Sequence, residues 1–239
     1  YKQTILGPVW YLIQPLASSL ILYVVFSKIA RLPTGGIPPF LFYLSGNLMW
    51  IYFSENIIKT SETFIQNANI FGKVYFPRLT VPISISISGL ISFFIQFTLF
   101  GGFYLYFIVS TGMPGPGIAI LYLPLVILQL VLSSFAVGVI IAALTNKYRA
   151  LRFTLKFGIQ LWMFGSPIAY PISQVPPEYI DLYMLNPVTP AIEMFRFIFF
   201  GNTIMEAHHI ISSAAVSIAL FLISILLFNR VEKTFMDTV

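Results

Sequence analysis

Long apolar runs separated by short polar links divide the chain into six segments. The runs cover approximately residues 9–27, 38–58, 82–110, 118–144, 153–172 and 210–228. Each run reaches or approaches the roughly 20 residues that an α-helix needs to cross the hydrocarbon core of a membrane. The runs are continuous and lack the alternation of apolar and polar positions found in transmembrane β-strands. The pattern therefore predicts an all-α integral membrane protein with six transmembrane helices.

Basic residues gather in every second link. If the six spans alternate in direction, ten of the 13 Lys and Arg residues fall on one side, and only Lys28, Arg31 and Arg196 fall on the other. Lys and Arg are enriched in cytoplasmic loops. The pattern therefore predicts that both termini are cytoplasmic.

The link between the last two runs, residues 171–209, is too long for a simple loop. It contains "NPVTPAIEMFRFIFFG", an apolar stretch too short to span, which is bounded by Pro187, Pro190 and Gly201. Such a stretch is typical of a re-entrant helical hairpin or of a helix that lies at the membrane interface. We expect a hairpin on the periplasmic side, and a purely interfacial helix is the alternative.

The link after the second run predicts a cytoplasmic helix over residues 61–75. Ser61 is a candidate N-cap, and polar and apolar side chains fall on opposite faces at helical spacing. The polar face comprises Glu62, Gln66, Asn69 and Lys73. This helix would either anchor the chain at the interface or offer its polar face to a partner.

Composition agrees with a single membrane domain and excludes several kinds of site. Hydrophobic residues make up 58% of the chain and charged residues 9%, against roughly 25% charged in soluble domains. Cysteine is absent, so the chain has neither a disulfide framework nor a thiolate metal site. The only Gly-Lys pair, in "FGKV", lacks the upstream glycine and the hydroxyl residue of a phosphate-binding loop. No cofactor, and in particular no ATP, is expected to bind this chain by that route.

Catalytic and metal sites are not predicted either. His208 and His209 are adjacent, so on a helix their side chains are expected to diverge by about 100° and not to share one metal. Asp181 and Glu178 lie in a proline-rich link and are expected to form a solvated turn. Glu55 is the acidic residue well inside a run, and Lys59 at i+4 predicts a structural salt bridge. With so little charge in the spans, an ion-driven mechanism is disfavoured and the energy source is expected to lie elsewhere.

The fifth run carries an aromatic stripe that differs from the others. Phe153, Phe157, Gln160 and Phe164 follow helical spacing, and Pro167 continues the series. Most of the other aromatic residues are expected to face lipid or to lie at the interfaces. Rings around one amide would suit a path for a neutral, hydroxyl-rich chain.

The first run begins with a polar approach, "YKQTILGPVWYLIQP". Trp10 and Gln14 share a face at i and i+4, whereas Tyr11 points away. A helix that only anchors the chain does not typically carry this mixture of aromatic, amide and proline residues.

Six segments resemble the permease subunit of ABC type-2 exporters of bacterial surface polysaccharides, the Wzm-like O-antigen, capsule and teichoic-acid transporters. The segments run nearly from end to end: "YKQTILGPVWYLIQP", "FLFYLSGNLMWIYFSENI", "NIFGKVYFPRLTVPIS", "NKYR", "LWMFGSPIAYPISQVPPEY" and "YMLNPVTPAIEMFR". One departure is Ala150, which follows "NKYR" where that family usually has Asp.

The resemblance implies one transmembrane domain over residues 1–239 in a homodimer that pairs with two copies of a separate ATPase, which binds ATP and Mg²⁺. It implies a pore between the first and fifth spans of the two subunits, a coupling role for the 61–75 helix and a gate formed by the 171–209 hairpin. With this resemblance, Gly7 and Pro8 would form a bend after an interfacial segment upstream of residue 1, and Trp10 and Gln14 are candidates for the cytoplasmic mouth of the pore. The cargo would be a glycan on polyprenyl pyrophosphate in the bacterial inner membrane. The anionic head group of that lipid would suit the basic residues Lys2, Arg149, Arg152 and Lys156.

The sequence thus predicts a membrane permease that exports lipid-linked O-antigen polysaccharide, and not an enzyme. A capsule or teichoic-acid exporter and a type-2 exporter of drugs or small lipids are the alternatives. A polytopic glycosyltransferase is disfavoured because carboxylates are sparse.

Overall fold

The computed structural model describes residues 7–67, 77–147, 151–201 and 205–236, and all regular structure within these ranges is helical. The long helices are α1 (Gly7–Leu22), continued by the π-helical turn η1 (Tyr23–Ile29), α2 (Pro39–Ser61), α5 (Thr80–Thr111), α6 (Leu123–Lys147), α7 (Leu151–Phe164) and α10 (Ala207–Met236). The short ones are α3 (Thr63–Gln66), η2 (Ile118–Tyr122), η3 (Ile172–Gln174), η4 (Pro177–Tyr179), α8 (Ile180–Met184) and α9 (Thr189–Phe200).

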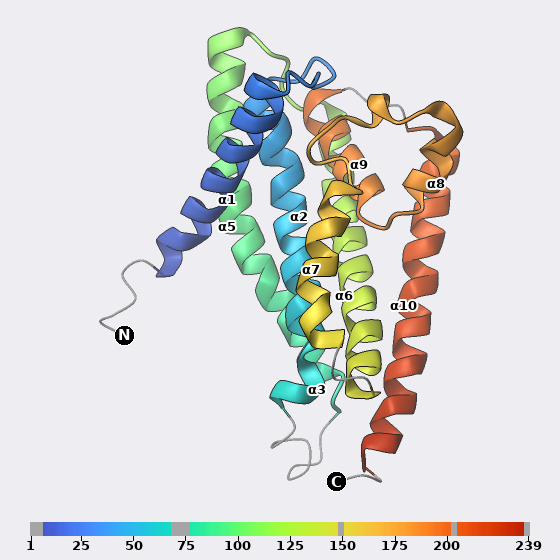
Figure 1. Cartoon of the computed structure of the whole chain (residues 1–239). Helices are drawn as coiled ribbons and strands as arrows, with labels where there is room; N and C mark the ends of the chain where they lie inside the picture. The colour runs from blue at the N-terminus through green and yellow to red at the C-terminus, as the bar shows by residue number, and fades with distance from the viewer. Residues whose placement is uncertain (1–6, 68–76, 148–150, 202–204, 237–239) are drawn as a thin grey trace.

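The long helices alternate in direction along one bundle (Figure 1). As drawn there, the links at residues 30–38, 112–117 and 171–201 lie at the upper end, and α3 and the end of α10 lie at the lower end. The predicted alternation of the runs is therefore present in the fold.

Four helices among the described residues are long and apolar enough to cross a membrane. They are Val9–Ile29, Thr80–Thr111, Ile118–Thr145 and His208–Val231. These spans confirm the first, third, fourth and sixth predicted helices, with ends within a few residues of the apolar runs.

α2 is the central helix of the bundle, and 17 of its 23 residues are buried. It packs against α1, α5, α6, α7 and α9. Its polar side chains bond to these neighbours: Asn47 Nδ2 donates to Ser18 Oγ on α1 (2.6 Å), and Asn56 Nδ2 donates to Ser134 Oγ on α6 (2.7 Å). Interhelical hydrogen bonds of this kind stabilise helix packing where water is absent. α2 is therefore helical over the second predicted run, and its Asn47 and Asn56 side chains face the protein.

The fifth run is only partly helical, because α7 ends at Phe164 and residues 165–170 form turns. The prediction of a continuous helix to residue 172 is therefore wrong at its end. Pro167 lacks a backbone N–H and disfavours the helical conformation of the residue before it. The freed carbonyls have other partners: the Tyr170 hydroxyl donates to Phe164 O (2.9 Å), and Asn186 Nδ2 donates to Gly165 O (3.0 Å).

Aromatic rings pack α9 into the upper half of the bundle. Phe100 of α5 lies 5.2 Å from Phe195 and 5.0 Å from Phe199, measured between ring centroids. The Tyr104 hydroxyl donates to Phe199 O (2.7 Å). Part of the aromatic set therefore forms the core of the protein and does not face outward.

Candidate functional site

The aromatic stripe of α7 lies on the outer surface of the chain. Phe153, Phe157 and Phe164 are 84%, 63% and 49% exposed, and Gln160 is also exposed. The opposite face of the helix is anchored: Ile159 is buried, and the Trp162 ring packs edge-on against Phe53 of α2 at 5.4 Å. The predicted stripe is thus one continuous surface that no other described part of the chain covers.

Trp10 and Gln14 are also exposed, on α1. One turn further along α1, the helix is held to α2 by Asn47, whose Nδ2 contacts the Ser18 and Ser19 hydroxyls at 2.6 and 2.9 Å. α1 packs on α2 and α5, whereas α7 packs on α2 and α6. The two sets of predicted path residues therefore flank α2 and do not meet within one chain (Figure 1).

The predicted coupling helix differs at its start from the sequence prediction. Ser61 is the last residue of α2, not an N-cap, and its hydroxyl donates to Ile58 O (2.7 Å). Thr145 Oγ1 of α6 donates to Ser61 O (3.3 Å). α2 continues to Ser61 because its last turn packs on α6. The helical conformation is interrupted at Glu62, between α2 and α3.

α3 nevertheless presents the expected polar and apolar faces. Gln66 Nε2 donates to the Glu62 carboxylate, so these two residues share a face. Phe64 is buried and stacks on Phe228 of α10 with centroids 4.8 Å apart. Asn69 and Lys73, the other predicted contact residues, lie outside the described residues.

The predicted head-group residues are placed only in part. Lys156 is exposed on α7. Arg152 lies in the first turn of the same helix. Lys2 and Arg149 lie outside the described residues. The salt bridge predicted between Glu55 and Lys59 is confirmed, with Nζ 2.7 Å from Oε2.

A buried ion pair on α9 was not predicted as a site. Arg196 Nη1 lies 3.0 Å from Glu193 Oε1, and both side chains are almost fully buried. Arg196 Nη2 donates to Phe42 O (3.2 Å), and its guanidinium carbon lies 3.6 Å from the centroid of the Phe42 ring. The two charged groups line a cavity of about 280 Å³ at the upper end, together with Thr34 and Pro171. The i,i+3 spacing of opposite charges was the available sequence signal.

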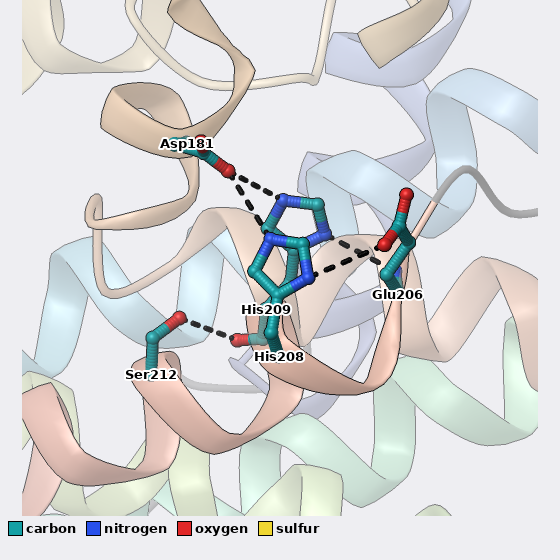
Figure 2. A network of polar contacts seen from close by, with 5 residues as sticks. All are labelled: Asp181, Glu206, His208, His209 and Ser212. Carbon is teal, nitrogen blue, oxygen red and sulfur yellow. Dashed lines mark hydrogen bonds and ion pairs between the residues drawn. The ribbon is translucent and has the colours of Figure 1, made fainter.

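A second polar cluster joins α8 to the start of α10 (Figure 2). Asp181 Oδ1 lies 2.9 Å from His209 Nε2 and 3.3 Å from His208 Nε2. The two imidazole centroids are 3.8 Å apart. The expectation that these side chains diverge is therefore wrong: the spacing of adjacent residues fixes the Cα–Cβ directions, but the side-chain rotamers bring both rings to one carboxylate. The hydrogen bonds with His209 and then His208 lower the pKa of Asp181 below its ordinary value.

The sequence offered no signal for this cluster. Asp181 is 27 residues from His208 and 28 from His209. The path of the chain through η4, α8 and α9 brings them together, and that path depends on how α9 packs in the bundle.

Comparisons with known proteins agree with the fold. Residues 1–200 match the family model described as ABC-2 type transporter. The chain is 25% identical to the O-antigen export system permease protein RfbA of Myxococcus xanthus, over all of this chain and 90% of that protein. It is 26% identical to the protein of the same name from Klebsiella pneumoniae, over 99% of this chain and 89% of that protein. These matches confirm the resemblance identified from six sequence segments. The chain belongs to the family of ABC-2 type transporters, and it is a transporter permease rather than an enzyme.

Proposed function

We propose that this permease exports polyprenyl-pyrophosphate-linked polysaccharide of the O-antigen type across the bacterial inner membrane. The observation that carries the proposal is the end-to-end similarity to permeases named for O-antigen export. The exposed stripe of Phe153, Phe157, Gln160 and Phe164 supports it further. Aromatic faces pack on the apolar faces of sugars, and a single amide adds a hydrogen-bonding group without a charge that would trap the cargo.

Six spans and cytoplasmic termini are part of this proposal. α2 has 23 residues, which gives it a length of about 35 Å, enough to cross the hydrocarbon core. α7 is shorter, and the turns at residues 165–170 would complete the fifth crossing. The upper end of the bundle would then be periplasmic, with α9 as the returning arm of a re-entrant hairpin. α9 packs on α2 and α6, so this arm of the hairpin is covered by protein. Non-helical backbone at membrane depth is tolerated only where protein or a water-filled cavity covers it.

The working transporter in this proposal is a homodimer bound to two ATPase subunits. α1 and α7 leave their aromatic faces uncovered on opposite sides of α2, so the path residues of one chain can meet those of a second chain. The ATPase would dock at the lower end on Glu62 and on Gln66 of α3, and Asn69 and Lys73 would complete the contact. Lys2, Arg149, Arg152 and Lys156 would hold the pyrophosphate head group near the cytoplasmic surface.

The path is tested by replacing Phe157 and Phe164 together by Ala. The glycan should lose its stacking partners while the inner face of α7 stays intact. We expect glycan on the cell surface to fall at least several-fold, while the permease still copurifies with its ATPase. The measurement is surface glycan in cells that depend on this transporter, normalised to the amount of permease in the membrane.

Phe94→Ala is the matched control. Phe94 on α5 is 49% exposed, as Phe164 is, but lies outside the stripe. The path assignment is wrong if the double variant exports normally or if Phe94→Ala reduces export equally. Transport of small lipids or dyes without any glycan lipid would instead favour a drug or lipid exporter.

A further inference from the structure

We propose that Asp181, His208 and His209 form a binding site for a divalent transition-metal cation, with Zn²⁺ as the best match. One ligand atom from each of the three side chains lies within 4.8 Å of the other two. Imidazole nitrogen and carboxylate oxygen are a ligand set that Zn²⁺ accepts in proteins, whereas Ca²⁺ and Mg²⁺ prefer oxygen ligands alone.

The distances between ligand atoms suit a tetrahedral ion. Bonds of about 2.0 Å place two ligands of a tetrahedral Zn²⁺ about 3.3 Å apart. Asp181 Oδ1 lies 3.3 Å from His208 Nε2 and 2.9 Å from His209 Nε2. Asp181 and His208 are exposed, so their side chains can rotate to admit an ion between the three atoms. A water molecule can occupy the fourth position.

His208 is already oriented for this role. Its Nδ1 lies 3.4 Å from Glu206 Oε2, on the far side of the ring from Asp181. With an ion bound, a carboxylate at that nitrogen would favour the tautomer with the proton on Nδ1 and leave the Nε2 lone pair to the metal. Figure 2 shows Glu206 and Asp181 on opposite sides of the two rings. Glu206 is therefore a positioning residue for the metal ligand His208.

His209 must change tautomer when the ion binds. Its Nδ1 accepts a hydrogen bond from the Glu206 backbone N–H (3.1 Å), so the proton of the neutral ring stands on Nε2 and points to Asp181. The ion would replace that proton, the proton would move to Nδ1, and the Glu206 amide would turn to water. Metal binding therefore costs one backbone hydrogen bond, which the metal–nitrogen bond offsets.

The site has a clear structural consequence. Asp181 belongs to α8, and both histidines belong to the first turn of α10. His209 is buried, whereas Asp181 and His208 are exposed, so the ion can enter from solvent. A bound ion would cross-link the 171–201 segment to the last helix at the upper end of the bundle.

The chain is well suited to a direct test because it has only two histidines and no cysteine. The full chain, purified with its ATPase partner and an affinity tag without histidine, is titrated with ZnCl₂ against a chromophoric indicator. We expect one Zn²⁺ per permease chain. His208→Ala, His209→Ala and Asp181→Ala should each weaken binding more than about 100-fold, and Glu206→Gln should weaken it by about 10- to 100-fold, the range found for outer-shell partners.

Two further measurements keep the result decisive. Glu178→Gln removes an exposed carboxylate three residues from Asp181 and should leave the affinity unchanged. Zn²⁺ should raise the unfolding temperature of the unaltered protein, because an ion that binds only the folded state stabilises it; it should leave that of the His208→Ala, His209→Ala double variant unchanged. The proposal is overturned if no saturable binding is found, or if the double variant binds Zn²⁺ with the same affinity.

Discussion

Arg196 lies against α2 beside Gly46, where a larger side chain would displace the guanidinium. A Cβ atom added to Gly46 would lie 2.8 Å from Arg196 Nη2. The guanidinium also reaches Phe42 O and the Phe42 ring. These contacts, with Glu193 as the counter-ion, fasten α9 to the centre of the bundle.

Loss of Arg196 should therefore destabilise the upper half of the bundle. Arg196→Leu leaves the Glu193 carboxylate buried without its partner, which typically costs about 3–5 kcal/mol. We expect a lower unfolding temperature of the purified permease in detergent. Combining Arg196→Leu with Glu193→Leu should recover much of the loss, because no charge is then left unpaired. A double variant no more stable than Arg196→Leu alone would show that the ion pair is not the reason.

For single residues, the sequence predicted contacts within one helix better than contacts between distant segments. The Glu55–Lys59 bridge was predictable because residues four apart on a helix are neighbours. The contact between Arg196 and Phe42 spans 154 residues, and the His208 and His209 rings converge through rotamers that neither spacing nor composition determines. Such contacts become visible only when the helices are packed.

Among the elements, α3 shows most directly how packing can position a docking surface. Phe64 is inserted between α6 and α10, where it belongs to a small core with Phe135, Val139 and Phe228. Glu62 and Gln66 lie beside it on the polar face. The apolar anchor thus fixes the direction in which the polar face points.

Reversing charge on that face should weaken the association with the ATPase. We expect Glu62→Lys combined with Gln66→Lys to reduce copurification of the ATPase several-fold and to lower export in proportion, because the polar contact face is altered while Phe64 stays in place. Glu178→Lys, at the opposite end of the bundle, is the control and should retain the complex. A Glu62→Lys, Gln66→Lys variant that assembles and exports normally would contradict the coupling role.

The same element shows the limit of local patterns. The two faces of α3 were predictable from helical spacing, but its start was not, because α2 extends to Ser61 through contacts of its last turn with α6. A Cβ on Gly138 of α6 would lie 2.8 Å from Thr60 Cβ, which shows how closely these helices approach. The four apolar helices were predicted well because length and apolar composition are local properties. The end of α7 was not predicted well, because the carbonyls freed there accept hydrogen bonds from Tyr170 and Asn186, which lie outside the helix.

For the whole molecule, the distribution of uncovered surface favours assembly with a second chain. α2 is enclosed by its neighbours, whereas α1 and α7 each expose an aromatic face and do not pack on one another. In the proposed homodimer, the path would lie between two copies, with α1 of one chain facing α7 of the other. The family resemblance implied this arrangement, and the six predicted path residues, all exposed on α1 and α7, are compatible with it.

The absence of cysteine makes this arrangement directly testable by cross-linking. We expect a Trp10→Cys, Phe157→Cys double variant, assembled with its ATPase in membranes, to form covalent dimers with a short thiol-reactive cross-linker, because the two positions would face each other across the subunit interface. Ile223 of α10 is 47% exposed and is the matched control. An Ile223→Cys variant should remain monomeric, since α10 lies on the other side of the bundle from α1 (Figure 1). Gel electrophoresis under denaturing conditions measures the dimer fraction. Glycan cargo in the path should reduce cross-linking by separating the two thiols. Equal dimer formation by the α10 variant would contradict the proposed arrangement and place the interface elsewhere on the molecule.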